Sequence, residues 1–207
     1  MANNNNIKDR DLTLDCLALK QKDAYLGIQA LMKLFNDEKV DGVEEIDFWH
    51  TSISCNTYDL GVKMFGKKRN KYACIIKSIL KDDDNLHSEL AAKKFEKLLS
   101  MSGFDRYFYI QIVNNKYAYV YDLEKLDMSK VKVKPWTYTV KQICQPAPVV
   151  THLTLYIPYT MAIGKIDISE YVEEAYEKTE KYWWCQDFPC PTYKKISGDY
   201  EFSLCQP

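Results

Sequence analysis

A carboxylate and an ammonium lie on two neighbouring segments that read as the strands of one hairpin. The stretch YDLGVKMFGKKRNKYACIIKS spans residues 58–78, with Asp59 at the start of its first strand and Lys77 near the end of its second. Hydrolysis of a phosphodiester with Mg²⁺ uses such groups, because carboxylates hold the ion and a nearby Lys polarises the attacking water. Such an ion is usually held by two carboxylates, and the residue two positions before the Lys is Ile75, which has none.

Other acidic residues could replace the missing carboxylate. The candidates are Glu45 and Asp47 on the preceding predicted strand and Glu89 on the following predicted helix. If Asp59 and Lys77 act together, we expect their charged groups to share one pocket at ~3–6 Å, where a charge perturbs its partner. The alternative interpretation is that both are ordinary strand-end residues, joined at most as an ion pair.

The turn between the two strands is a candidate contact for nucleic-acid phosphates. Its cations are Lys67, Lys68, Arg69 and Lys71. The whole chain has 28 Lys and Arg against 29 Asp and Glu, a formal net charge of −1, which excludes a strongly basic nucleic-acid binder. Nucleic-acid binding would therefore be weak and would depend on this local patch. Lys outnumbers Arg heavily, which favours phosphate attraction over base reading.

Hydrophobic periodicity predicts a central mixed sheet flanked by helices. Residues 22–37 and 86–101 carry apolar residues at helical spacing. The predicted strands are 44–54, 58–65, 71–80, 105–113 and 117–123, the last two forming a hairpin turned at Asn114 and Asn115. The order of helix, three strands, helix and two strands indicates an α/β or α+β domain.

The flanking regions extend this core. We expect a flexible tail over residues 1–10, a core over 11–126 and a C-terminal extension over 127–207 that packs on the core. Residues 11–19 alternate like a strand, or else start the first helix early. In the extension, residues 130–144 and 149–163 read as β structure, 167–184 as a helix, and the Pro-interrupted segment 185–207 as a wrap over the body.

The order of elements and the phrases YDL and IIKS resemble the PD-(D/E)XK nuclease superfamily, which has the restriction-endonuclease-like fold. The resemblance covers residues 22–126. It implies that Asp59 binds the metal, that Asp59 and Lys77 are catalytic, and that an active centre is a phosphodiester hydrolase using Mg²⁺. Because Ile75 departs from the acid-x-Lys pattern, it implies a degenerate centre, in a protein that associates with nucleic acid or takes part in assembly.

Two shorter motifs resemble those of the 2H phosphoesterases. His50 and Ser52 lie in HTSI, and His152 and Thr154 lie in HLTL. This resemblance implies metal-free phosphodiester cleavage by the two His residues, with the hydroxyls holding the phosphate. A central strand at 11–19 beside 150–157 would favour this fold, whereas the unremarkable interpretation is that both His residues pack on strands.

A third interpretation is a structural or adaptor protein of a phage or mobile element, with homo-oligomeric or protein partners. The 16 Tyr residues would then supply contact surface. Seven scattered Cys residues favour free thiols over a disulfide framework. The start of the chain does not read as a signal peptide, and no apolar run approaches ~18 residues. We therefore predict a cytoplasmic protein without membrane association, or a virion-associated one if a phage encodes it.

Overall fold

The described residues of the computed structural model form three α-helices and eleven strands. They are residues 5–37, 43–50, 58–80, 87–139, 149–182, 191–196 and 199–204. The helices are α1 (Asn5–Asp37), α2 (Ala92–Leu99) and α3 (Val172–Tyr182). The strands are β1 (Val43–His50), β2 (Leu60–Gly66), β3 (Asn70–Ile79), β4 (His87–Ala91), β5 (Arg106–Val113), β6 (Tyr117–Asp122), β7 (Lys132–Thr139), β8 (Val149–Pro158), β9 (Gly164–Asp167), β10 (Pro191–Ile196) and β11 (Asp199–Leu204).

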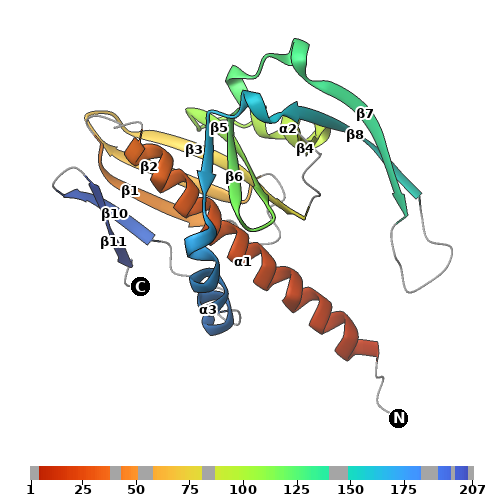
Figure 1. Ribbon diagram of the computed structural model, residues 1–207, viewed down its shortest axis with the longest axis horizontal. Coiled ribbons are helices and arrows are strands. Elements are labelled where there is room, and N and C mark those ends of the chain that lie inside the picture. Colours follow the sequence, from red (N-terminus) through yellow and green to blue (C-terminus); the bar gives the residue numbers. More distant parts are fainter. Residues whose placement is uncertain are drawn as a thin grey trace.

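The strands form two sheets (Figure 1). The large sheet has the order β11-β10-β1-β2-β3-β5-β6-β9, in which β3 and β5 are parallel. Strands β1, β2 and β3 form an antiparallel meander, and β5 and β6 form an antiparallel hairpin. A mixed sheet flanked by helices is the predicted fold class. The order of helix, meander, helix and hairpin matches the layout that the nuclease resemblance implies.

Helix α1 crosses one face of the large sheet and covers its main core (Figure 1). Leu26 and Leu31 of α1 belong to one buried apolar cluster with Cys74 of β3. Gly27 allows the helix to lie close to the sheet, because a Cβ there would be 2.7 Å from Cδ1 of Ile76. The apolar stripe that predicted this helix is therefore the surface that α1 buries.

The opposite face of the same strands packs against α2 and a small sheet of order β4-β8-β7. Ile75 of β3 and Tyr109 of β5 cluster there with Leu90, Leu98 and Leu155. Because side chains alternate along a strand, β3 contributes to both cores.

Two predicted elements are wrong in part. Helix α1 begins at Asn5, so it includes part of the expected tail, and of the two alternatives for residues 11–19 the early start of the first helix is confirmed. In the predicted helix over 86–101, His87–Ala91 form strand β4 and only α2 is helical. Ser88 and Leu90 are buried between partly exposed neighbours, a period of two, and β4 pairs with β8, which is distant in sequence.

The C-terminal segment extends the large sheet, whereas the sequence predicted a wrap over the body. Strand β10 pairs with β1, and β11 pairs with β10. At the other end of the sheet, β9 pairs with β6. These pairings satisfy backbone groups that would otherwise be exposed at the edges of β1 and β6.

Several local predictions are confirmed. The meander and the β5–β6 hairpin lie where expected, and Asn114 and Asn115 have positive φ values of 54° and 52°, as a tight hairpin turn requires. Residues 51–54, the predicted end of the first strand, lie outside the described residues. Over the part of the chain that the structure describes, no helix has the length and apolarity needed to cross a bilayer.

Candidate functional site

A pocket of about 260 Å³ opens where β3, β4, α2 and β8 meet. It is lined by Lys77 and Ile75, from the predicted metal centre, and by His152 and Thr154, from the predicted two-histidine site. Glu89, Lys94 and Trp136 also line it. The tertiary structure thus brings residues from two separate sequence predictions into one place.

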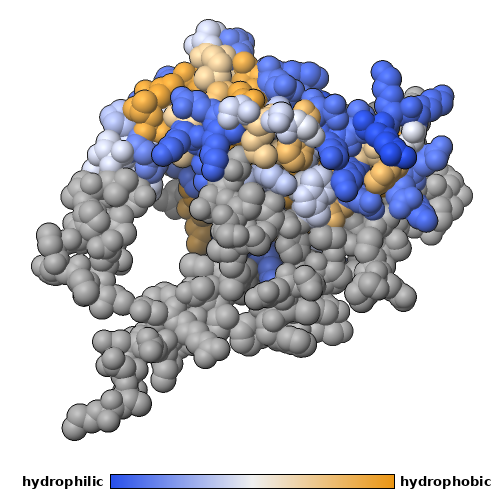
Figure 2. All heavy atoms as spheres, turned by 180° about the vertical axis from the view of Figure 1, so that it is seen from behind, coloured by the Kyte–Doolittle hydropathy of each residue, from blue (hydrophilic) through white to orange (hydrophobic). Residues whose placement is uncertain are grey.

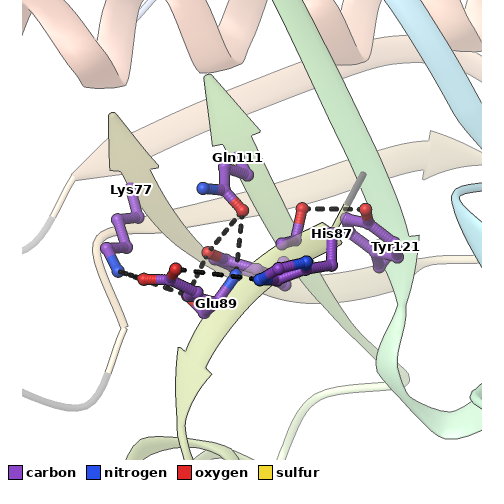
Figure 3. A network of polar contacts seen from close by, with 7 residues as sticks. Lys77, His87, Glu89, Gln111 and Tyr121 are labelled. Atoms are coloured by element: carbon purple, nitrogen blue, oxygen red, sulfur yellow. Dashed lines mark hydrogen bonds and ion pairs between the residues drawn. The ribbon is translucent and has the colours of Figure 1, made fainter. Parts of the chain in front are cut away.

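The Lys77 ammonium is paired with a carboxylate from the small sheet (Figure 3). Its Nζ lies 3.5 Å from Oε2 of Glu89 and 3.5 Å from the backbone oxygen of the same residue. On its other side, the Glu89 carboxylate lies 4.0 Å from Nε2 of His87. The Lys77 side chain is 44% exposed, so the pair contributes at most about 1 kcal/mol. Glu89, predicted on a helix, reaches this position from β4.

The backbone of Glu89 is fixed from strand β5. Gln111, which is fully buried, accepts a hydrogen bond from the Glu89 N–H at 3.1 Å, and the Tyr109 hydroxyl donates to the Glu89 carbonyl at 2.6 Å. The hydroxyls of Ser88 and Tyr121 are 2.8 Å apart (Figure 3). Burial raises the pKa of both tyrosines, so they stay protonated. These bonds hold β4 against β5 and β6 and so place the Glu89 carboxylate in the pocket.

Position 75, where the nuclease resemblance implies a second acid, belongs to the apolar core. The Ile75 side chain is 2% exposed and clusters with Leu90, Leu98 and Tyr109. A carboxylate in that position would lose its hydration without a polar replacement.

Asp59 directly precedes β2 and is not among the residues that line the pocket. Its Oδ2 accepts a hydrogen bond from the Ile76 N–H at 2.9 Å, and its own N–H donates to the Cys74 carbonyl at 2.8 Å. Within the described ranges, no ion pair joins Asp59 to Lys77. Asp59 and Lys77 thus have other polar partners, and their joint action stays a prediction from the sequence.

A carboxylate that the sequence analysis did not select lies close to Asp59. Asp23 of α1 accepts a hydrogen bond from the Ser78 hydroxyl at 2.5 Å, and its Oδ1 is 3.8 Å from Nζ of Lys22. Burial raises the pKa of Asp23 and the Asp59 charge adds to the increase, while Ser78 and Lys22 oppose it. No local pattern marks Asp23, because its environment exists only once α1 crosses β3.

We expect Asp23→Asn to raise the Tm at neutral pH and to leave it nearly unchanged below pH 3.8, the ordinary pKa of the group. Because the folded-state pKa is raised, the folded protein holds this proton more tightly than the unfolded chain, and stability falls as pH rises through the raised value. The Asn amide keeps an acceptor for Ser78 without the charge. Each kcal/mol gained shifts Tm by about 2–4 °C at this chain length.

Thermal melts from pH 7 downward test this expectation, with and without Mg²⁺. A lower Tm of the variant at every pH would contradict it. A Mg²⁺-dependent rise in the Tm of the native protein that Asp23→Asn abolishes would instead show that the Asp23 carboxylate takes part in binding a cation.

The donors at the predicted centre do not fit a divalent metal ion. Position 75 offers no oxygen, the Glu89 carboxylate is held by the Lys77 ammonium, and Asp59 lies outside the pocket. Across the described residues, no three His, Cys, Asp or Glu side chains converge as metal ligands. Mg²⁺ requires a near-octahedral set of oxygens built around one or two carboxylates. The metal-binding role of Asp59 stays a prediction from the sequence.

Comparison with known proteins finds a likeness to a solved structure. No protein-family model and no curated protein sequence matches the chain. The chain is similar to the solved structure of Hjc, a Holliday junction resolvase from Archaeoglobus fulgidus, which has the restriction-endonuclease-like fold. The match has 12% sequence identity and a TM-score of 0.33, and it covers 67% of this chain and 96% of that chain.

The basic turn lies at the far end of β3 from the pocket. Its four cations, Lys67, Lys68, Arg69 and Lys71, are exposed. Six residues of extended strand separate Lys71 from Lys77, roughly 20 Å. On the face shown in Figure 2, hydrophilic side chains gather at the end of the molecule that carries this turn, and hydrophobic ones gather over β7 and β8. The turn and the pocket are two separate candidate contacts for phosphate.

The two predicted histidines lie on strands of different sheets. His50 ends β1 in the large sheet, and His152 lies on β8 in the small sheet. The side chain of His50 and the whole of Ser52 lie outside the described residues. The two-histidine alternative needs residues 11–19 to form a strand beside β8. These residues belong to helix α1 instead. The pairing of the two histidines has no support from the fold.

Sequence reasoning missed Lys94 and Trp136, which line the pocket. Lys94 is exposed on α2, and Trp136 is 49% exposed on β7. A single Lys on a helix and a single Trp on a strand are common in any protein, so no local signal could have selected them. Their importance follows from the pairing of β4 with β8 and of β7 with β8.

Proposed function

We propose that this protein binds nucleic acid through its phosphate groups and does not cleave it efficiently with a divalent metal. The observation that carries the proposal is the apolar burial of Ile75 beside a Lys77 ammonium that is already paired with Glu89. The arrangement offers cations for phosphate but lacks the second carboxylate that a metal-bound phosphodiester needs.

Two groups of cations support phosphate binding. The basic turn presents exposed Lys67, Lys68 and Arg69, and the pocket presents Lys77 and Lys94. Each contact with a duplex phosphate releases counterions and changes the slope of log K against log salt by about 0.9. Because the net charge is −1, binding depends on these local groups and should be weak.

A plasmid-nicking assay with Mn²⁺ and a duplex-binding assay at low salt test the proposal together. We expect nicking at background level in the native protein, Asp59→Ala and Lys77→Ala, with duplex affinity that falls as salt rises. Replacing Lys67, Lys68 and Arg69 with Ala should reduce the salt slope by up to about 3. Lys130→Ala, an exposed cation elsewhere that pairs with Asp127, is the matched control.

Two outcomes would overturn this function. Robust nicking that both Asp59→Ala and Lys77→Ala abolish would show a working metal centre whose second acid lies elsewhere. Failure to bind either duplex or single-stranded DNA at low salt would remove nucleic acid as the partner and would favour the role in protein assembly.

A further inference from the structure

The pocket contains a buried hydroxyl that has no partner within the protein. Thr154 is 5% exposed and lines the pocket, and its Oγ1 has no hydrogen-bond partner among the described residues. An unsatisfied buried hydroxyl destabilises a protein by about 1–3 kcal/mol, so native structures rarely keep one without a use. A ligand in the pocket that accepts a hydrogen bond would satisfy it.

The charge of the pocket favours an anionic ligand. Among the residues that the structure describes, Lys77 and Lys94 line it, together with one carboxylate, that of Glu89. Among the described residues, Lys94 forms no ion pair, and the Lys77–Glu89 pair is weak enough for a stronger anion to compete with it. Two ammoniums and a hydroxyl donor match the oxygens of a phosphate group.

The β7–β8 hairpin adds an aromatic wall to the same pocket. Trp136 and His152 are directly opposite each other in the register of these two strands, and both line the pocket. Their ring centroids are 5.2 Å apart with planes at 69°, an edge-to-face arrangement. The half-exposed Trp136 indole is therefore held in place by its neighbour, next to the cations. A rigid aromatic side chain beside cations is the pattern on which proteins stack the bases of single strands.

We propose that this pocket binds one nucleotide unit of a single-stranded nucleic acid. The phosphate contacts Lys77, Lys94 and the Thr154 hydroxyl, and the base stacks on Trp136. This proposal rests on the proposed function and assigns the kind of nucleic acid that the pocket takes. A volume of about 260 Å³ is below the 300–1,000 Å³ typical of drug-sized ligands, so it suits one unit of a strand and excludes a duplex.

The test compares a short 5′-phosphorylated, fluorescein-labelled oligothymidylate with a duplex of equal length by anisotropy, at low salt without divalent metal. Trp136→Ala should weaken single-strand binding by about 5-fold to 150-fold and leave duplex binding within about 2-fold.

Thr154→Val should weaken single-strand binding by at least about 5-fold, while the Tm of the variant stays equal to that of the native protein or rises, because the unsatisfied hydroxyl is gone. Lys94→Ala should reduce the single-strand salt slope by about 0.7.

Matched controls lie beside each variant. Thr151→Val is on the same strand, where the Thr151 hydroxyl is bonded to Thr137 at 2.8 Å outside the pocket, and Lys93→Ala is the neighbouring exposed cation on α2. Both should bind the oligothymidylate like the native protein. Competition by thymidine monophosphate at comparable affinity would support the pocket and identify a free nucleotide as its ligand.

Failure of this inference can be told apart from failure of the proposed function. Native-like single-strand binding by Trp136→Ala and Thr154→Val, with duplex binding intact, would overturn the pocket assignment and leave phosphate binding by the basic turn. Equal losses for single strand and duplex would also overturn it. Absence of binding to both probes in the native protein would remove both proposals.

Discussion

Ile75→Glu is expected to lower the free energy of unfolding by about 4 kcal/mol or more, without producing Mn²⁺-dependent nicking. The native side chain is 2% exposed in a cluster with Leu90, Leu98 and Tyr109. Losing its burial removes about 1.5–3 kcal/mol, and desolvating a carboxylate adds several more. The substitution restores the acid-x-Lys pattern in the sequence, but its main effect should therefore be to destabilise the core.

Two control substitutions separate the effect of losing the buried side chain from the effect of adding a negative charge. Ile75→Val should lower the unfolding free energy by only about 0.5–1.5 kcal/mol, and Lys71→Glu, at an exposed position of the same strand, should change it by about 0.5 kcal/mol or less. Urea unfolding curves measure all three variants. An Ile75→Glu protein as stable as the native one, with nicking activity, would show that the pocket lining tolerates a carboxylate at position 75 and that this carboxylate completes a metal site.

Arg106→Ala is expected to lower the free energy of unfolding by about 3–5 kcal/mol. The Asp122 side chain is 1% exposed, and Arg106 donates to it through Nε at 3.1 Å and through Nη2. The guanidinium also lies 5.0 Å from the ring centroid of Phe108. Removing Arg106 leaves a buried carboxylate with weak compensation, and the penalty is mainly the desolvation of that charge.

A second cation on the same carboxylate supplies the control. Nζ of Lys125 is 3.6 Å from Oδ2 of Asp122, but its side chain is 71% exposed, so Lys125→Ala should cost at most about 1 kcal/mol. Combining Arg106→Ala with Asp122→Asn should recover part of the loss, because the orphaned charge is gone. Urea unfolding of the single and double variants gives the coupling free energy. Equal losses for Arg106→Ala and Lys125→Ala would show that the carboxylate is not buried in solution.

Local periodicity in the sequence was enough to determine most individual elements. The apolar stripe over 22–37 predicted the buried face of α1, and alternation predicted the meander and the β5–β6 hairpin. Asn114 and Asn115 marked the hairpin turn because they tolerate positive φ. The departure at Ile75 was also visible in the sequence, since it needs only the spacing to Lys77. These features depend on residues close together along the chain.

The site itself was decided by pairing between distant segments. The local sequence predicted His87–Ala91 as part of a helix, but these residues form a strand because they pair with β8. That pairing places Glu89 beside Lys77 and places Thr154 in the same pocket. The C-terminal hairpin joined β1 for the same kind of reason, because an unpaired sheet edge favours any strand that can reach it. Backbone pairing and burial between remote residues leave no period in the local sequence, so only the tertiary structure shows which charges meet.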